Sequence, residues 1–462
     1  MVVAAGQRIH MVGIGGAGMS GIARVLAEKG CIVSGSDLQE SNVTRSLSEL
    51  GVKIYFGHAA ANVEDGVQML VVSSAIPASN PELVAAVSCG IPVLKRGQML
   101  AHLFNEKKGI AVAGAHGKTT TTSMIYTVFS HCQYDPTFIV GGELQGTHLS
   151  ARLGKSPYAV VEADESDGSF LELKPYAAVV TNIEDDHLDY YRSLDNIRQA
   201  FRQYIAGVQK DGFAIVYGED ISIKAISDGL ETRLVTYGED TRDDYCIADW
   251  QAEGMGSRFD LYRQGCLLGG IQLAVPGRHN ALNAAAAAAC ALEMGLDFSK
   301  IKDGLKRFTG AKRRFEVVGQ KRDILVVDDY AHHPTEIEAT LAAARGFHPQ
   351  GRLLVVFQPH RYSRTQLLGE QLGEALKEGD LVIITDVYPA GETSIPGING
   401  EIVYEAARKA GIECRYLPSL AQAEDWLLTE VQAGDMVITM GAGDVWKLGP
   451  ALLEKMASQP NI

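Results

Sequence analysis

A glycine-rich stretch contains the first residues whose types and spacing could do chemistry. It reads Gly114-Ala115-His116-Gly117-Lys118-Thr119-Thr120 and follows the apolar run 110–113. The glycines would let backbone N–H groups surround a phosphate, and the N-terminus of a following helix would add its positive dipole end. Lys118 can reach the outer phosphates of a nucleotide, and the Thr119 hydroxyl can ligate Mg²⁺. The stretch therefore predicts a phosphate loop for a nucleoside triphosphate.

The spacing of this loop departs from the usual pattern. G-x-x-x-x-G-K-[ST] would place its first glycine at position 112, where the chain has Val112. The alternative is an ordinary glycine-rich turn between a strand and a helix. The Gly-Lys-Thr sequence nevertheless falls at the strand-to-helix junction that phosphate binding requires, and this favours the phosphate loop.

A second glycine motif, Gly13-Ile14-Gly15-Gly16-Ala17-Gly18, follows a predicted strand at 8–12 and precedes a predicted helix at 19–29. Asp37 ends the next strand, where an acceptor for a ribose hydroxyl belongs. The motif is weak alone, but its context predicts a nucleotide pyrophosphate site. An NAD-dependent dehydrogenase would use the same motif, although that function would leave the phosphate loop unexplained.

Acidic residues and a histidine follow two further strands. Glu162 stands in the predicted strand 158–164, and His187 follows the predicted strand 177–183. The carboxyl ends of parallel strands meet at one edge of a sheet, so these residues should converge with the phosphate loop. Thr119, Glu162 and His187 are then candidate Mg²⁺ ligands. By residue type alone Glu162 could equally be a salt-bridge partner, and His187 is more typical of a solvated surface.

The last third of the chain holds a group of histidines and arginines: His332, His333, His360, Arg361 and Arg364. Such histidines could bind zinc, but the neighbouring arginines favour an anionic phosphate or carboxylate. The basic run Lys312-Arg313-Arg314 could be solvated. It could also place one arginine on a γ-phosphate when domains close.

The composition excludes several classes of protein. The chain has 462 residues and a formal net charge of −14, which argues against a general nucleic-acid binder. Its seven cysteines are scattered without a C-x-x-C pair, which is typical of a reducing cytoplasm. We see no signal peptide and no apolar run of membrane-spanning length. A cytoplasmic protein without membrane association is expected.

Alternating strands and helices predict an α/β fold of three consecutive domains. These are an N-terminal Rossmann-like domain (1–106), a central parallel sheet of the phosphate-loop ATPase type (107–311) and a C-terminal Rossmann-like domain (312–462). Further strands are expected over 31–37, 52–56, 68–72, 91–94, 213–217, 233–237, 258–262, 266–273, 323–328, 352–357, 380–384 and 435–440, and further helices over 42–50, 123–129, 195–208, 281–292 and 335–345.

Taken together, these stretches resemble the Mur ligase family, which also uses the shortened phosphate loop. The resemblance spans all three predicted domains in order and is therefore more specific than any single motif. The matching pieces are Gly13–Gly21, Gly114–Thr120, Glu162–Asp167, Thr181–Ile183 with His187, Gly277–Asn280 with Asn283, Arg313–Phe315, Asp328–Glu336 and Gln358–Arg364.

The resemblance implies that ATP lies on residues 114–120, with Lys118 on its phosphates. It also implies that Mg²⁺ is bound by Thr119, Glu162 and His187, which reverses the surface interpretation of His187. Some relatives carry a carbamylated lysine after the metal histidine, but this chain has no lysine between His187 and Lys210. The remaining implied ATP contacts are His279 and Asn283 on the adenine side, Asp329 on the ribose, and Arg314 reaching across from the third domain.

The implied substrates are UDP-N-acetylmuramate and L-alanine. The first domain would bind UDP rather than a dinucleotide, and the third domain would bind the amino acid. The residues implied for UDP are Gly15, Gly16, Ser20 and Asp37, and those implied for L-alanine are Tyr330, His360 and Arg364.

The implied reaction is ATP-dependent amide formation through an acyl phosphate, a step in the synthesis of peptidoglycan precursors. Lys118, Mg²⁺ and Arg314 would stabilise the charge on the transferring group. The attacking amine must be neutral, and His332 or His333 is our hypothesis for its proton acceptor. Domain closure is expected, because water would hydrolyse an exposed acyl phosphate.

Two alternatives remain open beside the dehydrogenase. A murein-peptide recycling ligase would join a tripeptide to the same nucleotide sugar, and its third domain would have to admit a larger acceptor. A non-catalytic, nucleotide-switched module would bind ATP without making an amide. We expect a monomer or a weak homodimer.

Overall fold

The computed structural model describes residues 3–147 and 149–458. The chain forms two compact units. The first comprises residues 1–248, 260–271 and 282–308, and the second comprises residues 249–259, 272–281 and 309–462.

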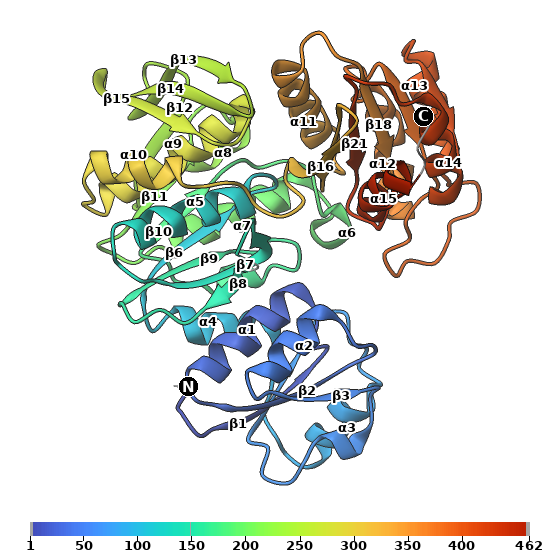
Figure 1. The fold of residues 1–462 in the computed structure, drawn as a ribbon. Helices are drawn as coiled ribbons and strands as arrows, with labels where there is room; N and C mark the ends of the chain where they lie inside the picture. Colours follow the sequence, from blue (N-terminus) through green and yellow to red (C-terminus); the bar gives the residue numbers. More distant parts are fainter. Residues whose placement is uncertain (1–2, 148, 459–462) are drawn as a thin grey trace. The chain divides into compact units, whose positions relative to one another are not determined.

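The first unit begins with a five-stranded parallel sheet in the order β3-β2-β1-β4-β5. Figure 1 labels three of its strands, β1, β2 and β3. The strand order reverses at β1, the position at which parallel α/β sheets commonly bind ligands. The elements are β1 (Arg8–Val12), α1 (Ala17–Glu28), β2 (Ile32–Asp37), α2 (Asn42–Glu49), β3 (Lys53–Phe56), η1 (Ala60–Asn62), β4 (Met69–Val72), α3 (Pro81–Ser88), β5 (Val93–Lys95) and α4 (Arg96–Phe104).

Side-chain alternation along β1 and β4 explains how this sheet is covered on both faces. Ile9 and Met11 belong to the core that contains α1, whereas Val12 packs with Ala86 of α3. Successive strand residues point to opposite faces, so each strand serves two helix layers. The helices α3 and α4 were not expected from the sequence.

A buried polar cluster lies on the α3 side of this sheet. The Glu82 carboxylate accepts hydrogen bonds from the Ser36 hydroxyl (2.7 Å) and the Asn62 amide (3.0 Å), and it contacts His10 Nε2 at 2.8 Å and His58 Nδ1 at 3.2 Å. His10, Ser36 and Glu82 are fully buried. The cluster therefore ties β1, β2 and the loop after β3 to the N-terminus of α3.

The ten-stranded central sheet has the order β15-β14-β13-β12-β11-β10-β6-β9-β7-β8. Its early elements are β6 (Lys108–Ala113), α5 (Lys118–His131), β7 (Thr137–Leu144), β8 (Leu149–Arg152), β9 (Tyr158–Glu162), η2 (Ser169–Glu172), β10 (Ala177–Val180), α6 (Leu188–Tyr191) and α7 (Leu194–Ala206). Its later elements are β11 (Phe213–Tyr217), α8 (Ile221–Ser227), β12 (Arg233–Gly238), β13 (Tyr245–Glu253), β14 (Gly256–Arg263), β15 (Cys266–Leu273), α9 (Arg278–Glu293) and α10 (Phe298–Lys306). The division between the two units passes through β13, β14, β15 and α9.

β6 lies between β9 and β10 and runs parallel to both. Val112 is in register with Glu162, and Ala113 is in register with Val180. The phosphate loop, the acids after β9 and the segment after β10 therefore leave the sheet at one edge, as predicted. Both flanking strands end earlier than expected, at Glu162 and Val180. The β7–β8 pair is antiparallel, and neither of its strands was predicted from the sequence.

The second unit contains a six-stranded sheet in the order β16-β17-β21-β18-β19-β20, with β16 antiparallel to β17. Leu354 and Val356 of β18 pack against the core that includes α14 and α15, and Val355 packs against the core of α11. The elements are β16 (Glu316–Lys321), β17 (Ile324–Asp329), α11 (Pro334–Phe347), β18 (Leu353–Phe357), α12 (Tyr362–Glu374), β19 (Leu381–Ile384), α13 (Glu401–Lys409), β20 (Cys414–Tyr416), α14 (Leu420–Glu430), β21 (Met436–Met440), η3 (Val445–Lys447) and α15 (Leu448–Ser458).

Within the described residues, no helix combines the length and the apolar character needed to cross a bilayer.

Candidate functional site

The phosphate loop joins β6 to α5 through two glycines in conformations that other residues rarely adopt. Gly114 has φ +139° and Gly117 has φ +81°. A Cβ atom at Gly117 would lie 2.6 Å from Asn283 Oδ1, and one at Gly114 would collide with Thr181. The loop therefore needs glycine at both positions for space as well as for backbone conformation. Asn182 holds the turn, because its Oδ1 accepts from the His116 N–H at 2.9 Å.

Lys118 points back across this loop. Its Nζ donates to Gly114 O (2.5 Å), Ala115 O (3.0 Å) and Glu165 Oε1 (2.7 Å). Burial lowers the pKa of Lys118, but the nearby carboxylates of Glu165 and Glu162 outweigh burial and raise it. The side chain is thus a charged ammonium at the mouth of the loop. Sequence reasoning missed Glu165, although it lies inside the matched stretch Glu162–Asp167.

The three predicted metal ligands lie around the start of α5. Thr119 Oγ1 donates to Glu162 Oε2 at 3.0 Å, and the Gly141 N–H donates to the same oxygen. His187 Nε2 lies 3.6 Å from Glu165 Oε1 and 3.5 Å from Asp186 Oδ2. Burial lowers the pKa of His187, but its contacts with these two carboxylates raise it overall. The structure thus brings Thr119 and Glu162 into contact, and Glu165 connects Lys118 to His187.

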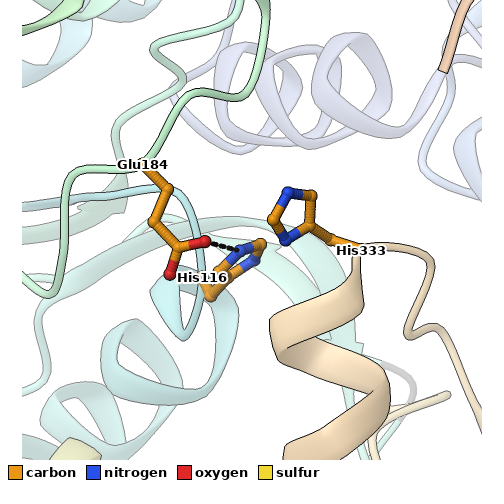
Figure 2. A group of neighbouring side chains, drawn as sticks. All are labelled: His116, Glu184 and His333. Carbon is orange, nitrogen blue, oxygen red and sulfur yellow. Dashed lines mark hydrogen bonds and ion pairs between the residues drawn. The ribbon is translucent and has the colours of Figure 1, made fainter. Parts of the chain in front are cut away.

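His116 and Asn283 also lie at this loop. His116 Nε2 lies 3.3 Å from Glu184 Oε2. Figure 2 marks this contact with a dashed line. Asn283 Oδ1 accepts from Thr121 Oγ1 at 3.2 Å, so this residue of α9 is anchored to the first turn of α5. Thr120 is buried in the same turn. The proposed adenine contact of Asn283 stays a prediction.

The residues predicted for UDP lie at the C-terminal end of β1. Asp37 Oδ2 accepts from the Gly15 N–H at 2.8 Å, which holds the end of β2 against the glycine loop. Gly16 is the N-cap of α1. Ser20, in the first turn of α1, donates to Ala17 O at 3.1 Å. The predicted set is thus gathered at one end of the parallel sheet, around the start of a helix.

Arg96 is a further charged residue beside the glycine motif 13–18, and it was not identified from the sequence. Its Nη2 lies 2.7 Å from Asp164 Oδ2 and 3.6 Å from Asp167 Oδ2. A Cβ atom at Gly18 would lie 2.8 Å from Arg96 Nη1. No local signal pointed to Arg96, because the helix α4 that it begins was not predicted.

In the second unit, Asp329 ends β17 and is buried. Its Oδ2 accepts from the Phe315 N–H at 2.7 Å and its Oδ1 from the Ala331 N–H at 2.8 Å. Burial raises the pKa of Asp329 to about 6, against the lowering effect of Arg314 and these two hydrogen bonds. Asp329 therefore shapes the turn after β17, and its predicted contact with a ribose stays a prediction.

The other predicted residues of the second unit surround this turn. Arg314 Nη1 donates to Glu336 Oε1 at 3.2 Å, and its guanidinium lies 5.3 Å from the centre of the Tyr330 ring. Arg364 Nη1 lies 3.4 Å from His360 Nδ1. His333 is buried and is the N-cap of α11. Tyr330, Arg314 and His333 thus occupy one stretch of chain around the start of α11.

Two histidines of this unit are expected to stay neutral well below pH 6.5. Burial, together with the charges of Arg314 at His279 and of Arg364 at His360, lowers each pKa to about 4. In the unfolded chain the imidazoles of His279 and His360 become protonated near pH 6.5. In the folded protein they become protonated only near pH 4. Lowering the pH through this window should therefore favour unfolding. Proton NMR titration should give apparent pKa values near 4, and His360→Gln should flatten the dependence of stability on pH between 6.5 and 4. A His360 resonance that titrates near pH 6.5 would contradict this.

Three family models match successive parts of the chain. The description "Mur ligase family, catalytic domain" matches residues 8–108, "Mur ligase middle domain" matches residues 112–291, and "Mur ligase, glutamate ligase domain" matches residues 313–443. The matched ranges together contain every predicted site residue.

Among curated proteins, the UDP-N-acetylmuramate–L-alanine ligase of Syntrophomonas wolfei is 58% identical over 457 residues, covering 98% of each chain. Among solved structures, the UDP-N-acetylmuramate–alanine ligase of Thermotoga maritima is 30% identical with a TM-score of 0.84, covering 98% of this chain and 99% of that one. A murein peptide ligase from Psychrobacter arcticus is 26% identical with a TM-score of 0.73, covering 99% of this chain and all of that one.

Proposed function

Since the chain belongs to the Mur ligase family and has its three-domain α/β fold, we propose that it joins L-alanine to the carboxylate of UDP-N-acetylmuramate, converting ATP to ADP and phosphate. The observation that carries this assignment is the 58% identity, over nearly the whole of both chains, to a ligase named for that reaction. Among the solved structures, the murein peptide ligase from Psychrobacter arcticus matches this chain less well than the Thermotoga maritima ligase, with a TM-score of 0.73 against 0.84. The recycling reaction is therefore the second candidate.

The phosphate loop fits ATP. Its two glycines have positive φ values, the backbone turns at the N-terminus of α5, and a buried ammonium lies at its mouth. We assign the nucleotide phosphates to residues 114–120, with Lys118 as the cation that contacts them. His279, Asn283, Arg314 and Asp329 complete the proposed ATP contacts.

The residues near Lys118 also fit a magnesium ion. Thr119 and Glu162 offer a hydroxyl and a carboxylate in contact with one another, and Mg²⁺ prefers oxygen ligands. Thr119, Glu162 and His187 would hold the ion. When bound there, Mg²⁺ would neutralise charge on the phosphates of the nucleotide.

In the proposed reaction, the lactyl carboxylate of the sugar attacks the γ-phosphorus of ATP, and the bond to the β,γ-bridging oxygen breaks to release ADP. Lys118 and Arg314 stabilise the negative charge on the transferring phosphoryl group. The amine of L-alanine then attacks the carbonyl carbon of the acyl phosphate, and inorganic phosphate leaves. We propose that His333 accepts the proton that the attacking amine loses.

The substrate contacts follow the expected division between domains. Gly15, Gly16, Ser20 and Asp37 would bind the UDP moiety, and Tyr330, His360 and Arg364 would bind L-alanine. We also propose the boundaries 1–106, 107–311 and 312–462. The support for a three-part division is that three family models match successive stretches of the chain, at 8–108, 112–291 and 313–443. We further propose that the protein is cytoplasmic and that it is a monomer or a weak homodimer.

The acceptor can be tested directly by phosphate release. With UDP-N-acetylmuramate, ATP and Mg²⁺, L-alanine should release phosphate and give a product heavier than the nucleotide sugar by one alanyl residue. A murein tripeptide should release little, because the third domain is assigned to a small acceptor. Omission of the nucleotide sugar is the control for plain ATP hydrolysis. A rate with the tripeptide and none with L-alanine would establish the recycling ligase instead.

A further inference from the structure

The ammonium of Lys118 has three N–H donors, and all three have acceptors. Two acceptors are carbonyl groups of the phosphate loop itself, Gly114 O and Ala115 O. The third is Glu165 Oε1, at 2.7 Å. A nucleotide phosphate can therefore accept from Lys118 only if one of these three bonds is given up.

Glu165 is the anionic member of the three acceptors, and its surroundings are unusual for a carboxylate. The residue is 3% exposed. Among the described residues its Oε2 has no hydrogen-bond partner, although it is buried. Buried carboxylates normally have their oxygens paired, since an unpaired buried polar atom costs free energy. The carboxylate has two cationic neighbours, Lys118 at 2.7 Å and His187 Nε2 at 3.6 Å, and the ion pair with Lys118 is the shorter contact that compensates for its burial.

The backbone at Glu165 is held firmly in place. Tyr191 Oη donates to Glu165 O at 2.5 Å, and the Gly168 N–H donates to the same oxygen at 3.0 Å. The carboxylate is therefore aimed at the phosphate loop by the fold of the segment after β9 and by α6. It is not a flexible surface acid that happens to meet a lysine.

We propose that Glu165 takes the place of a phosphate group on Lys118 in the nucleotide-free protein, and that ATP must displace it. This rests on the proposed ATP site. A carboxylate oxygen and a phosphate oxygen are both anionic acceptors, so they compete for the same donor. Glu165 keeps the ammonium extended and oriented at the loop, at the cost of weaker nucleotide binding. It acts through Lys118 and is a positioning residue.

Glu165→Gln should bind ATP more tightly than the wild-type protein. Glutamine has the same shape and retains an acceptor oxygen, but it lacks the charge that holds Lys118 and repels the phosphates. Both effects lower the dissociation constant, by on the order of tenfold for the loss of one charged hydrogen bond. The KM for ATP should fall with it, and the KM for L-alanine should not change.

The experiment is calorimetric titration of the full-length protein with ATP, in EDTA and again with Mg²⁺, alongside steady-state kinetics. Glu172→Gln, which neutralises an exposed carboxylate on η2, is the matched control and should bind ATP as the wild type does. Glu165→Asp, which withdraws the charge by one methylene, is the second variant and should give a smaller gain. If Glu165→Gln does not fold, Glu165→Asp is used in its place.

Two results would overturn the role of Glu165. Unchanged or weaker ATP binding by a folded variant would show that Glu165 does not compete with phosphate. Weakening that appears only with Mg²⁺ would make Glu165 a metal ligand instead. Absence of ATP binding by the wild-type protein would overturn the proposed function itself, so the two failures are distinguishable.

Discussion

Lys118→Ala should reduce amide formation by about 10³-fold or more. The side chain is the buried cation at the mouth of the phosphate loop, and its ammonium lies within hydrogen-bond distance of two carbonyl groups of the loop and of Glu165. Phosphoryl transfer depends on charge stabilisation and positioning, so the loss of this cation removes a stabilising contact from the transition state. The measurement is the rate of appearance of the alanylated nucleotide sugar by mass spectrometry.

The control for this variant is Lys174→Ala, which removes an exposed lysine outside the phosphate loop and should leave the rate unchanged. Circular dichroism must confirm that both variants are folded, because Lys118→Ala leaves the buried Glu165 carboxylate without its counter-ion and this destabilises the folded protein. Unchanged turnover by Lys118→Ala would contradict the proposed ATP site. ATP binding by the wild-type protein without any amide product would favour a nucleotide-switched module.

The second large effect is expected on stability and concerns the buried polar cluster around Glu82. Glu82→Gln should lower the free energy of unfolding of the N-terminal Rossmann-like module by about 2–4 kcal/mol. The fully buried carboxylate accepts from Ser36 and Asn62 and contacts two histidines, His10 and His58. Glutamine offers one acceptor oxygen and adds two donors, so some of these groups would lose their partner. The decrease should appear as a lower urea midpoint and as faster amide hydrogen exchange in β1 and β2.

The loss of stability in Glu82→Gln should depend on pH, which gives a second test of the role of the Glu82 carboxylate. Burial raises the pKa of Glu82, but the hydrogen bonds from His10, Ser36 and Asn62 outweigh burial and lower it to about 2. A carboxylate with a lowered pKa contributes stability above its ordinary value of 4.5, and that contribution is lost as the pH falls towards 2. The difference between the wild type and Glu82→Gln should therefore shrink below pH 4.5.

The matched control for Glu82→Gln is Glu49→Gln, which neutralises an exposed carboxylate at the end of α2 and should change stability by less than about 0.5 kcal/mol. Equal stability of Glu82→Gln and the wild type at pH 7 would show that the polar cluster is not needed to hold α3 on the sheet.

The convergence of the strand ends at one edge was predictable because the signals for it are local, although β9 and β10 themselves end earlier than expected. An apolar run followed by glycine or by an acid marks where a parallel strand ends, and the ends of neighbouring parallel strands meet at one edge. This is why residue order alone places Gly114, Glu162 and the segment before His187 together. The chain that joins them, including η2 and α6, has no comparable pattern and was not predicted.

The sequence by itself determined the order of the α/β modules, the phosphate loop with its lysine, and the family. Each of these depends on short stretches of consecutive residues and on their order along the chain. Only the tertiary structure decided which partners those residues take. Glu162 and Glu165 are both acids at the end of β9, yet one contacts Thr119 and the other Lys118. Arg96 meets Asp164 across 68 positions, and Glu82 meets His10 across 72. Such pairs depend on the path of loops and on the packing of helices, which residue type and spacing do not specify.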